Sequence, residues 1–200
     1  MPGYSRATFR AGAFVTMMFC TCAAIAAAAA PPHFVLEPSK SLLRFSFVQA
    51  GANNTGRFGK YTADVRFSND NLAASKIDVT IDIASLDTGD KERDDTLKGA
   101  DLFDVKKFPT ARFVSSKIVS SGAARYEAQG KLTIRNVTKD IKLPITFQTR
   151  QEGGKQMGYL TGRYTLKRLE YGVGQGDWKS TEWVKDDVLV TFSLKLKQAT

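Results

Sequence analysis

The segment Val188-Leu-Val-Thr-Phe-Ser-Leu-Lys-Leu196 carries an apolar residue at every second position. Between these residues lie Thr191, Ser193 and Lys195, together with Leu189. Successive side chains of a β-strand point to opposite faces, so this period of two predicts a strand. We expect one face of the strand to pack on a core and the other to meet water.

Seven other segments show the same alternation, namely Leu43–Phe47, Tyr61–Phe67, Ile77–Ile83, Ala111–Val119, Tyr126–Ile134, Ile141–Phe147 and Tyr159–Leu166. Residues typical of turns separate many of them, at Gly51–Gly56, Asn69–Asn71, Ser120–Gly122, Glu152–Gly154 and Gly172–Asp177. The sequence therefore predicts an all-β chain whose antiparallel strands are joined mainly by hairpins.

The number of predicted strands favours a closed barrel. About eight antiparallel strands make a barrel whose interior is just wide enough for side chains or one small ligand. Closure also removes exposed strand edges. The competing fold, an immunoglobulin-like sandwich, often surrounds a tryptophan with a cysteine pair. In this sequence Trp178 and Trp183 lie near the C-terminal end, far from Cys20 and Cys22.

The segment from Asp90 to Lys98 interrupts the strand pattern and predicts one short helix. Asp90 is suited to capping its first turn, and Gly99 is a stop signal. A helix at this position can lie over one mouth of the barrel. Leu97, Leu102 and Phe103 would then either plug the core or contact a bound ligand.

Residues 1–30 read as an export signal. Arg6 and Arg10 form a positive beginning, and an apolar run leads into an alanine tract. We expect cleavage near the end of this segment, with residues 31–200 forming one barrel domain in the periplasm or outside the cell. Both cysteines lie in the expected signal, so the domain would have neither disulfides nor thiolate chemistry.

The chain is basic, with a formal net charge of +9 at pH 7. Removal of the two signal arginines would leave +7. Such a charge permits transient contact with an anionic membrane surface, although alternating lysines on outward strand faces explain it equally simply. Zinc-ligand spacing, RNA-binding aromatic motifs and a recognition-helix pattern are missing from the sequence, so we do not expect nucleic acid as a partner.

The sequence offers little catalytic or metal-binding chemistry. His33 is the one histidine, and it lies close to the expected new terminus, where we predict a mobile segment. A serine or cysteine nucleophile needs a positioned base, and zinc or haem needs imidazole or thiolate ligands. We therefore expect no enzyme activity, no catalytic residue, no metal and no cofactor. Paired carboxylates remain, at Asp94 and Asp95, Asp101 and Asp104, and Asp186 and Asp187.

Phenylalanine is abundant, with thirteen residues, and most predicted strands carry at least one in the apolar phase. Aromatic side chains fill small barrels whether or not a ligand is bound. The residues alone therefore leave core packing and ligand binding as alternatives.

Several motifs carry a family resemblance. The central ones are Ser85-Leu-Asp-Thr-Gly89, Arg93-Asp94, Asp101-Leu-Phe103 and Phe108-Pro109. Others are Gly56-Arg-Phe58, Gly130-Lys-Leu-Thr-Ile-Arg-Asn-Val-Thr-Lys139 and Arg168-Leu-Glu-Tyr-Gly-Val173 followed by Gly174-Gln-Gly-Asp-Trp178. In these motifs the chain resembles the YceI-like family over residues 34–197. The resemblance implies an extended lipocalin-like barrel that holds a polyisoprenoid or its quinone or pyrophosphate derivative in an apolar tunnel.

The function expected from this resemblance is sequestration or transport of an isoprenoid lipid or isoprenoid quinone by a monomer or homodimer. The expected tunnel residues are Phe45, Phe47, Phe58, Phe67, Val79, Ile81, Leu97, Phe103, Phe108, Phe113, Leu132, Ile134, Phe147 and Tyr164, with Arg57, Arg168, Tyr171 and Trp178 near a mouth. For Arg57 and Arg168, a structural bond between strand ends and contact with a polar head group remain open alternatives.

Two other functions compete with lipid binding. One is a stress-related binding protein whose barrel is filled with side chains and whose loops meet a protein partner. The other is an enzyme that acts on a lipid head group through Asp94, Asp95 or Asp101.

Overall fold

The structure is a computed structural model that describes residue 3 and residues 29–199. The predicted signal peptide, with Cys20 and Cys22, therefore lies almost entirely outside the described residues. None of the helices within the described ranges is long and apolar enough to cross a membrane.

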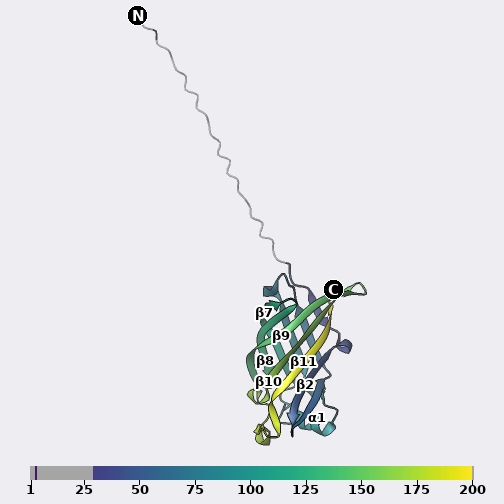
Figure 1. Cartoon of the computed structure of the whole chain (residues 1–200), viewed down its shortest axis with the longest axis vertical. Coiled ribbons are helices and arrows are strands. Elements are labelled where there is room, and N and C mark those ends of the chain that lie inside the picture. Colours follow the sequence, from purple (N-terminus) through teal and green to yellow (C-terminus); the bar gives the residue numbers. More distant parts are fainter. Residues whose placement is uncertain (1–2, 4–28, 200) are drawn as a thin grey trace.

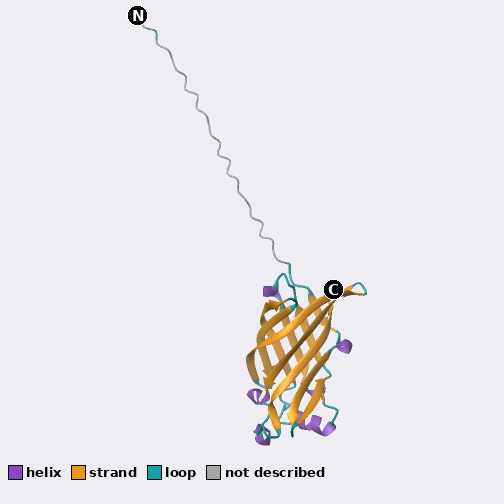
Figure 2. Cartoon of the chain, in the orientation of Figure 1, coloured by secondary structure: helices purple, strands orange, loops and turns teal. Residues whose placement is uncertain are grey.

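Strands make up most of the described chain (Figure 2). They are β1 (His33–Leu36), β2 (Leu42–Gln49), β3 (Ala52–Phe58), β4 (Tyr61–Arg66), β5 (Lys76–Asp82), β6 (Leu86–Asp87), β7 (Thr110–Gly122), β8 (Arg125–Ile134), β9 (Val137–Glu152), β10 (Lys155–Lys167) and β11 (Val184–Gln198). The helices are α1 (Lys91–Lys98) and five short 3-10 turns, η1 (Pro38–Lys40), η2 (Leu72–Ala74), η3 (Ile83–Ser85), η4 (Arg168–Tyr171) and η5 (Gly176–Lys179).

Eight antiparallel strands close the barrel, as the sequence predicts. The ring runs β1, β4, β5, β7, β8, β9, β10 and β11, and β11 pairs back onto β1. Figure 1 shows the long strands crossing the barrel at a slant, with α1 at the lower end. The remaining strands, β2, β3 and β6, extend the wall beside β11 toward that end.

The eight strands that close the ring are not the eight that alternation predicts. The closing strand is β1, which alternation misses because it has only four residues. It pairs with the last residues of β11, while β2, which alternation predicts, pairs with the earlier part of the same edge. One edge of β11 thus pairs with β2 along its first part and with β1 along its last part.

The predicted turn from Gly51 to Gly56 is wrong. The chain reverses at Ala50 and Gly51, whose φ angles are 51° and 77°, and β3 begins immediately afterwards at Ala52. Positive φ at both central residues is typical of a two-residue hairpin turn with the twist that strands require. β3 escapes prediction because its Asn-Asn-Thr sequence is polar on both faces.

The predicted turn from Ser120 to Gly122 is also wrong, since these residues still belong to β7. The reversal follows at Ala123 and Ala124, and Ala124 has a φ of 54°. The turn within Glu152–Gly154 is confirmed at Gly153 and Gly154, both of which have positive φ.

The predicted helix is confirmed as α1. The Asp90 carboxylate caps its first turn by accepting a hydrogen bond from the backbone N–H of Arg93 at 3.1 Å. The helix ends at Lys98, and the Gly99 N–H donates to the Thr96 carbonyl.

The core consists of two clusters of buried residues at different heights in the barrel. In the cluster farther from α1, the rings of Phe67 and Phe147 lie 4.3 Å apart and Phe34 packs edge-on against Phe147. In the cluster nearer α1, the rings of Phe45 and Phe58 lie 5.1 Å apart. Residues of both clusters border an open space inside the barrel.

Candidate functional site

A cavity of about 630 Å³ lies inside the barrel. Its wall is almost wholly apolar, because it is built from the inward-facing positions of the strands. On β11, for example, Val188, Val190, Phe192 and Leu194 line it at every second residue. The alternation that predicts the strand therefore also produces the cavity wall.

A glycine in β3 makes room for one of the aromatic wall residues. Gly56 lies opposite Phe45 in the neighbouring strand. A Cβ atom at residue 56 would lie 2.3 Å from the ring of Phe45. The ring can therefore lie flat along the wall only because residue 56 has no side chain.

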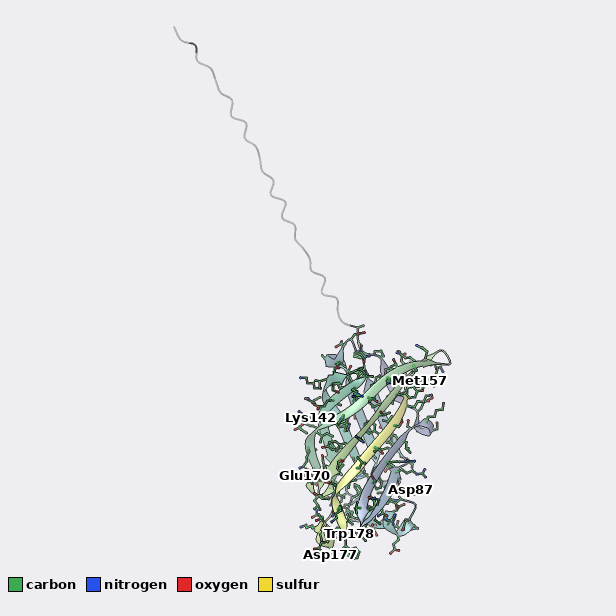
Figure 3. The ribbon with its side chains drawn as sticks, viewed as in Figure 1. Asp87, Lys142, Met157, Glu170, Asp177 and Trp178 are labelled. Atoms are coloured by element: carbon green, nitrogen blue, oxygen red, sulfur yellow. The ribbon has the colours of Figure 1, made fainter. Side chains whose placement is uncertain are left out.

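The polar residues of the lining gather at the end that α1 covers. Asp90, Glu92, Arg93 and Thr96 contribute from this helix and its cap, and Gln49 and Asn54 from the β2–β3 hairpin. We call this set of residues, with Trp183, the mouth. Figure 1 places α1 at the lower end of the barrel, and Figure 3 places Trp178 at the same end, opposite Met157.

Trp183 is the most exposed large apolar side chain among the described residues, at 69%. It lines the cavity, and its carbonyl accepts a 2.7 Å hydrogen bond from the N–H of Ala50 in the hairpin turn. The start of β11 is thereby tied to the hairpin at the mouth.

Arg168 is 3% exposed, and its guanidinium organises the loop next to the mouth. All five of its N–H groups can be accounted for by carbonyl acceptors, at distances between 2.7 and 3.2 Å, in Val173, Trp178, Ser180, Val184 and Lys185. Burial lowers the pKa of Arg168, and the nearby Asp186 carboxylate opposes that shift. This arrangement matches the structural alternative for Arg168.

The comparisons with known proteins fit this geometry. The sequence model of the YceI-like domain matches residues 34–196. The chain belongs to the YceI-like family.

Relatives of known sequence agree with the assignment. A UPF0312 protein of Vibrio vulnificus is 34% identical over 144 residues, which cover 70% of this chain and 72% of the relative. A UPF0312 protein of Pseudomonas savastanoi is 33% identical over 153 residues, covering 74% and 76% respectively.

Solved structures agree as well. BcnA of Burkholderia cenocepacia is 36% identical, with a TM-score of 0.74 over 82% of this chain and 99% of BcnA. The YCEI protein of Campylobacter jejuni is 27% identical, with a TM-score of 0.65 over 74% and 87%. A polyisoprenoid binding domain from Saccharophagus degradans, 15% identical, has a TM-score of 0.64 over 83% and 98%, which shows a shared fold.

In this YceI-like protein, the cavity wall includes most of the residues that the sequence suggests for a tunnel. These are Phe45, Phe47, Phe58, Val79, Ile81, Leu97, Phe103, Phe113, Leu132, Ile134, Tyr164, Arg168 and Trp178.

Five other suggested residues lie off the wall. Phe67 and Phe147 face the interior but pack in the cluster farther from the mouth. The ring of Phe108 lies 5.3 Å from the guanidinium carbon of Arg135. Alternation identifies an inward face but not a height in the barrel, so it cannot separate Phe67 and Phe147 from the phenylalanines that line the cavity.

The other two are Arg57 and Tyr171. Arg57 donates from Nε and Nη2 to one oxygen of Asp87, at 3.0 and 2.8 Å, and so joins β3 to β6. This is the structural alternative for Arg57. Tyr171 is 2% exposed, and burial is the main cause that raises its pKa to about 12.

The wall also includes residues in the apolar phase of predicted strands that are not among the expected tunnel residues, among them Leu43, Ile77, Ile141, Ile145, Leu160 and Leu194. The pattern could have supplied these. It carried no signal for Trp183 or for the hairpin residues Gln49 and Asn54.

The paired carboxylates of α1 make structural contacts. Asp94 accepts hydrogen bonds from both the N–H and the hydroxyl of Thr88, at 2.9 and 2.7 Å. Asp95 forms an ion pair with Lys91 one helical turn away. The Asp94 contacts fix the helix to the segment before it, and the Asp95 ion pair lies within the helix.

His33 is not in a mobile terminus, contrary to the sequence-based expectation. It begins β1, and its Nε2 lies 2.8 Å from a carboxylate oxygen of Asp64. Within the described part of the chain, no group of three or more histidine, cysteine, aspartate and glutamate side chains is placed to hold a metal ion.

Proposed function

We propose that this YceI-like protein binds one isoprenoid lipid or isoprenoid quinone in the barrel cavity and thereby sequesters or transports it. The observation that carries the proposal is the cavity of about 630 Å³ with an apolar wall and a polar mouth. Ligand sites of this kind are typically apolar, with a few polar groups that orient the ligand.

The cavity volume suits an isoprenoid chain. An apolar cavity of about 150 Å³ accepts benzene, which implies about 25 Å³ per carbon atom. By that measure about 25 carbons, or five isoprene units, fit into the cavity of this chain. A longer chain would extend through the mouth.

Apolar burial supplies the affinity. Each CH₂ group moved from water into an apolar site contributes about 0.8 kcal/mol. A chain of branched isoprene units can reach the wall over its whole length, so binding requires no charged contact. The Saccharophagus domain with the same fold is described as polyisoprenoid binding, which supports the proposal by analogy.

The place of action is part of the proposal. The basic start and apolar run of residues 1–30 support export to the periplasm or the medium. There the protein would protect the lipid from water while it moves between membranes, and the positive net charge would favour transient contact with an anionic surface.

The proposal is tested by titrating lipid-free protein with geranylgeraniol. Trp178 and Trp183 both line the cavity, so their fluorescence should report binding. The test variant combines Val79→Phe and Val190→Phe, which add bulk to two wall positions. The matched control combines Thr80→Phe and Thr191→Phe, at the next residue of the same strands and on the opposite face.

We expect saturable binding by the wild-type protein, with at least a tenfold loss in the wall variant, equivalent to about 1.4 kcal/mol. The control should bind like the wild type. Folding of each variant is checked by its thermal melt. Absence of saturable binding in the wild type, or equal effects of wall and control changes, would contradict the proposal.

A further inference from the structure

Carboxylates outnumber cations among the residues of the mouth. Two carboxylates, Asp90 and Glu92, and one guanidinium, Arg93, line this end of the cavity. Arg93 Nη2 lies 3.5 Å from an oxygen of Asp90, whereas Glu92 forms no ion pair within the described residues. Beside Trp183, the neighbouring Glu182 and Lys185 carry opposite charges.

Arg168 does not offer its positive charge to an incoming ligand. Its side chain contributes to the cavity wall, but its N–H groups donate to five backbone carbonyls. A phosphate could gain these donors only if the carbonyls lost them. Leaving a buried carbonyl without its hydrogen bond costs about 1–3 kcal/mol, so Arg168 is a poor anion ligand.

Two other polar groups of the wall are neutral. Tyr61 and Tyr164 line the cavity, and neither hydroxyl has a hydrogen-bond partner within the described residues. Burial raises the pKa of Tyr61, so its hydroxyl stays protonated at physiological pH. These hydroxyls can hydrogen-bond to a carbonyl or hydroxyl of a ligand without any charge.

We propose that Asp90 and Glu92 make the cavity selective for isoprenoids with an uncharged polar end, such as an alcohol or a quinone, over isoprenoid diphosphates. This inference rests on the proposed function and narrows its ligand class. A diphosphate would bring negative charge toward two carboxylates, and Arg93, the cation that lines the mouth beside them, already pairs with Asp90. Repulsion of this kind is a general means of rejecting one ligand while another still binds.

The test compares two probes with the same twenty-carbon chain, geranylgeraniol and geranylgeranyl diphosphate, at low ionic strength, where screening is weak. The mouth variant is Asp90→Asn with Glu92→Gln. Asparagine can still cap α1, so the helix should be retained. The control is Glu127→Gln with Asp140→Asn on β8 and β9, away from the cavity lining. Both pairs raise the net charge equally.

The wild type should bind the alcohol at least about tenfold more tightly than the diphosphate, the size of effect that one or two nearby like charges can produce. The mouth variant should reduce this ratio several-fold through tighter diphosphate binding, and the control should leave the ratio unchanged.

Two results would overturn the selectivity: equal affinity of the wild type for both probes, or a mouth variant whose ratio matches that of the control. Failure of the wild type to bind either probe would instead contradict the proposed function itself, and the selectivity with it. The two failures are therefore distinguishable.

Discussion

At the residue scale, the two family-motif arginines differ in what surrounds them. Arg168 is almost fully buried and satisfies five carbonyls, whereas the Arg57 side chain is 64% exposed and pairs with one carboxylate. Buried polar networks are costly to break, while exposed ion pairs contribute little. The two positions should therefore respond differently to the same substitution.

We predict that Arg168→Lys lowers the free energy of unfolding by at least about 3 kcal/mol, because lysine cannot satisfy all of the buried carbonyls. Arg57→Lys should cost less than about 1 kcal/mol. Urea unfolding of both variants measures this difference. Equal losses would mean that the carbonyls around Arg168 find other partners.

Tyr171 provides a pH-dependent prediction. Its pKa is raised to about 12 in the folded protein, chiefly by burial, from an ordinary value of 10.0. Between these values the unfolded chain loses the phenolic proton while the folded protein keeps it. Stability should therefore fall as the pH rises from about 10 to about 12, by at most about 1.4 kcal/mol per pH unit from this group.

Tyr171→Phe serves as the comparison, because phenylalanine keeps most of the buried ring but has no titrating group. Chemical denaturation of both proteins at a series of alkaline pH values should show a shallower decline for the variant. Parallel declines would show that Tyr171 contributes nothing to the alkaline transition.

At the element scale, α1 is a short helix at the mouth whose stability depends on its ends. None of its residues is buried, although Leu97 of the helix and Phe103 of the segment that follows reach the cavity wall. The Asp90 cap is therefore a large part of what holds the helix.

We predict that Asp90→Ala destabilises α1 locally by about 1 kcal/mol, the usual cost of losing an N-cap. Amide hydrogen exchange should accelerate in residues 91–98 and stay nearly constant in the barrel strands. Asp90→Asn, which retains a capping oxygen, is the control. Uniform acceleration across the strands would mean that the helix and barrel open as one unit.

The strands also show how far the sequence could predict this fold. Alternation found the long strands because each has one buried face, and Asp90 with Gly99 marked the helix. Alternation cannot predict β3, which is polar on both faces, or β6, which has only two residues. The family resemblance predicts an isoprenoid ligand, whereas alternation alone does not distinguish a ligand-filled barrel from one filled with side chains.

The same limit applies to the candidate site. Inward phase is a local property of a strand, so Phe113 and Phe147 look equivalent in sequence. In the structure Phe113 lines the cavity and Phe147 packs against Phe67. Height in the barrel depends on register with distant strands, and no local pattern encodes it.

At the scale of the whole molecule, the cavity volume sets a length for the ligand. Affinity should rise as the isoprenoid grows from ten to about twenty-five carbons, because each buried CH₂ adds about 0.8 kcal/mol at most. Beyond that length the added units lie outside the cavity, and affinity should level off. Titration with isoprenoid alcohols of increasing length measures this, and a steady rise well beyond twenty-five carbons would contradict the estimated capacity.

Whether the barrel encloses one isoprenoid is tested most directly by native mass spectrometry. The full-chain protein is expressed in a bacterium and purified without detergent. The account predicts a complex with one lipid per chain, released on unfolding and identified in the organic extract as an isoprenoid alcohol or quinone. A folded protein of bare polypeptide mass that also fails to take up added isoprenoid quinone would contradict it.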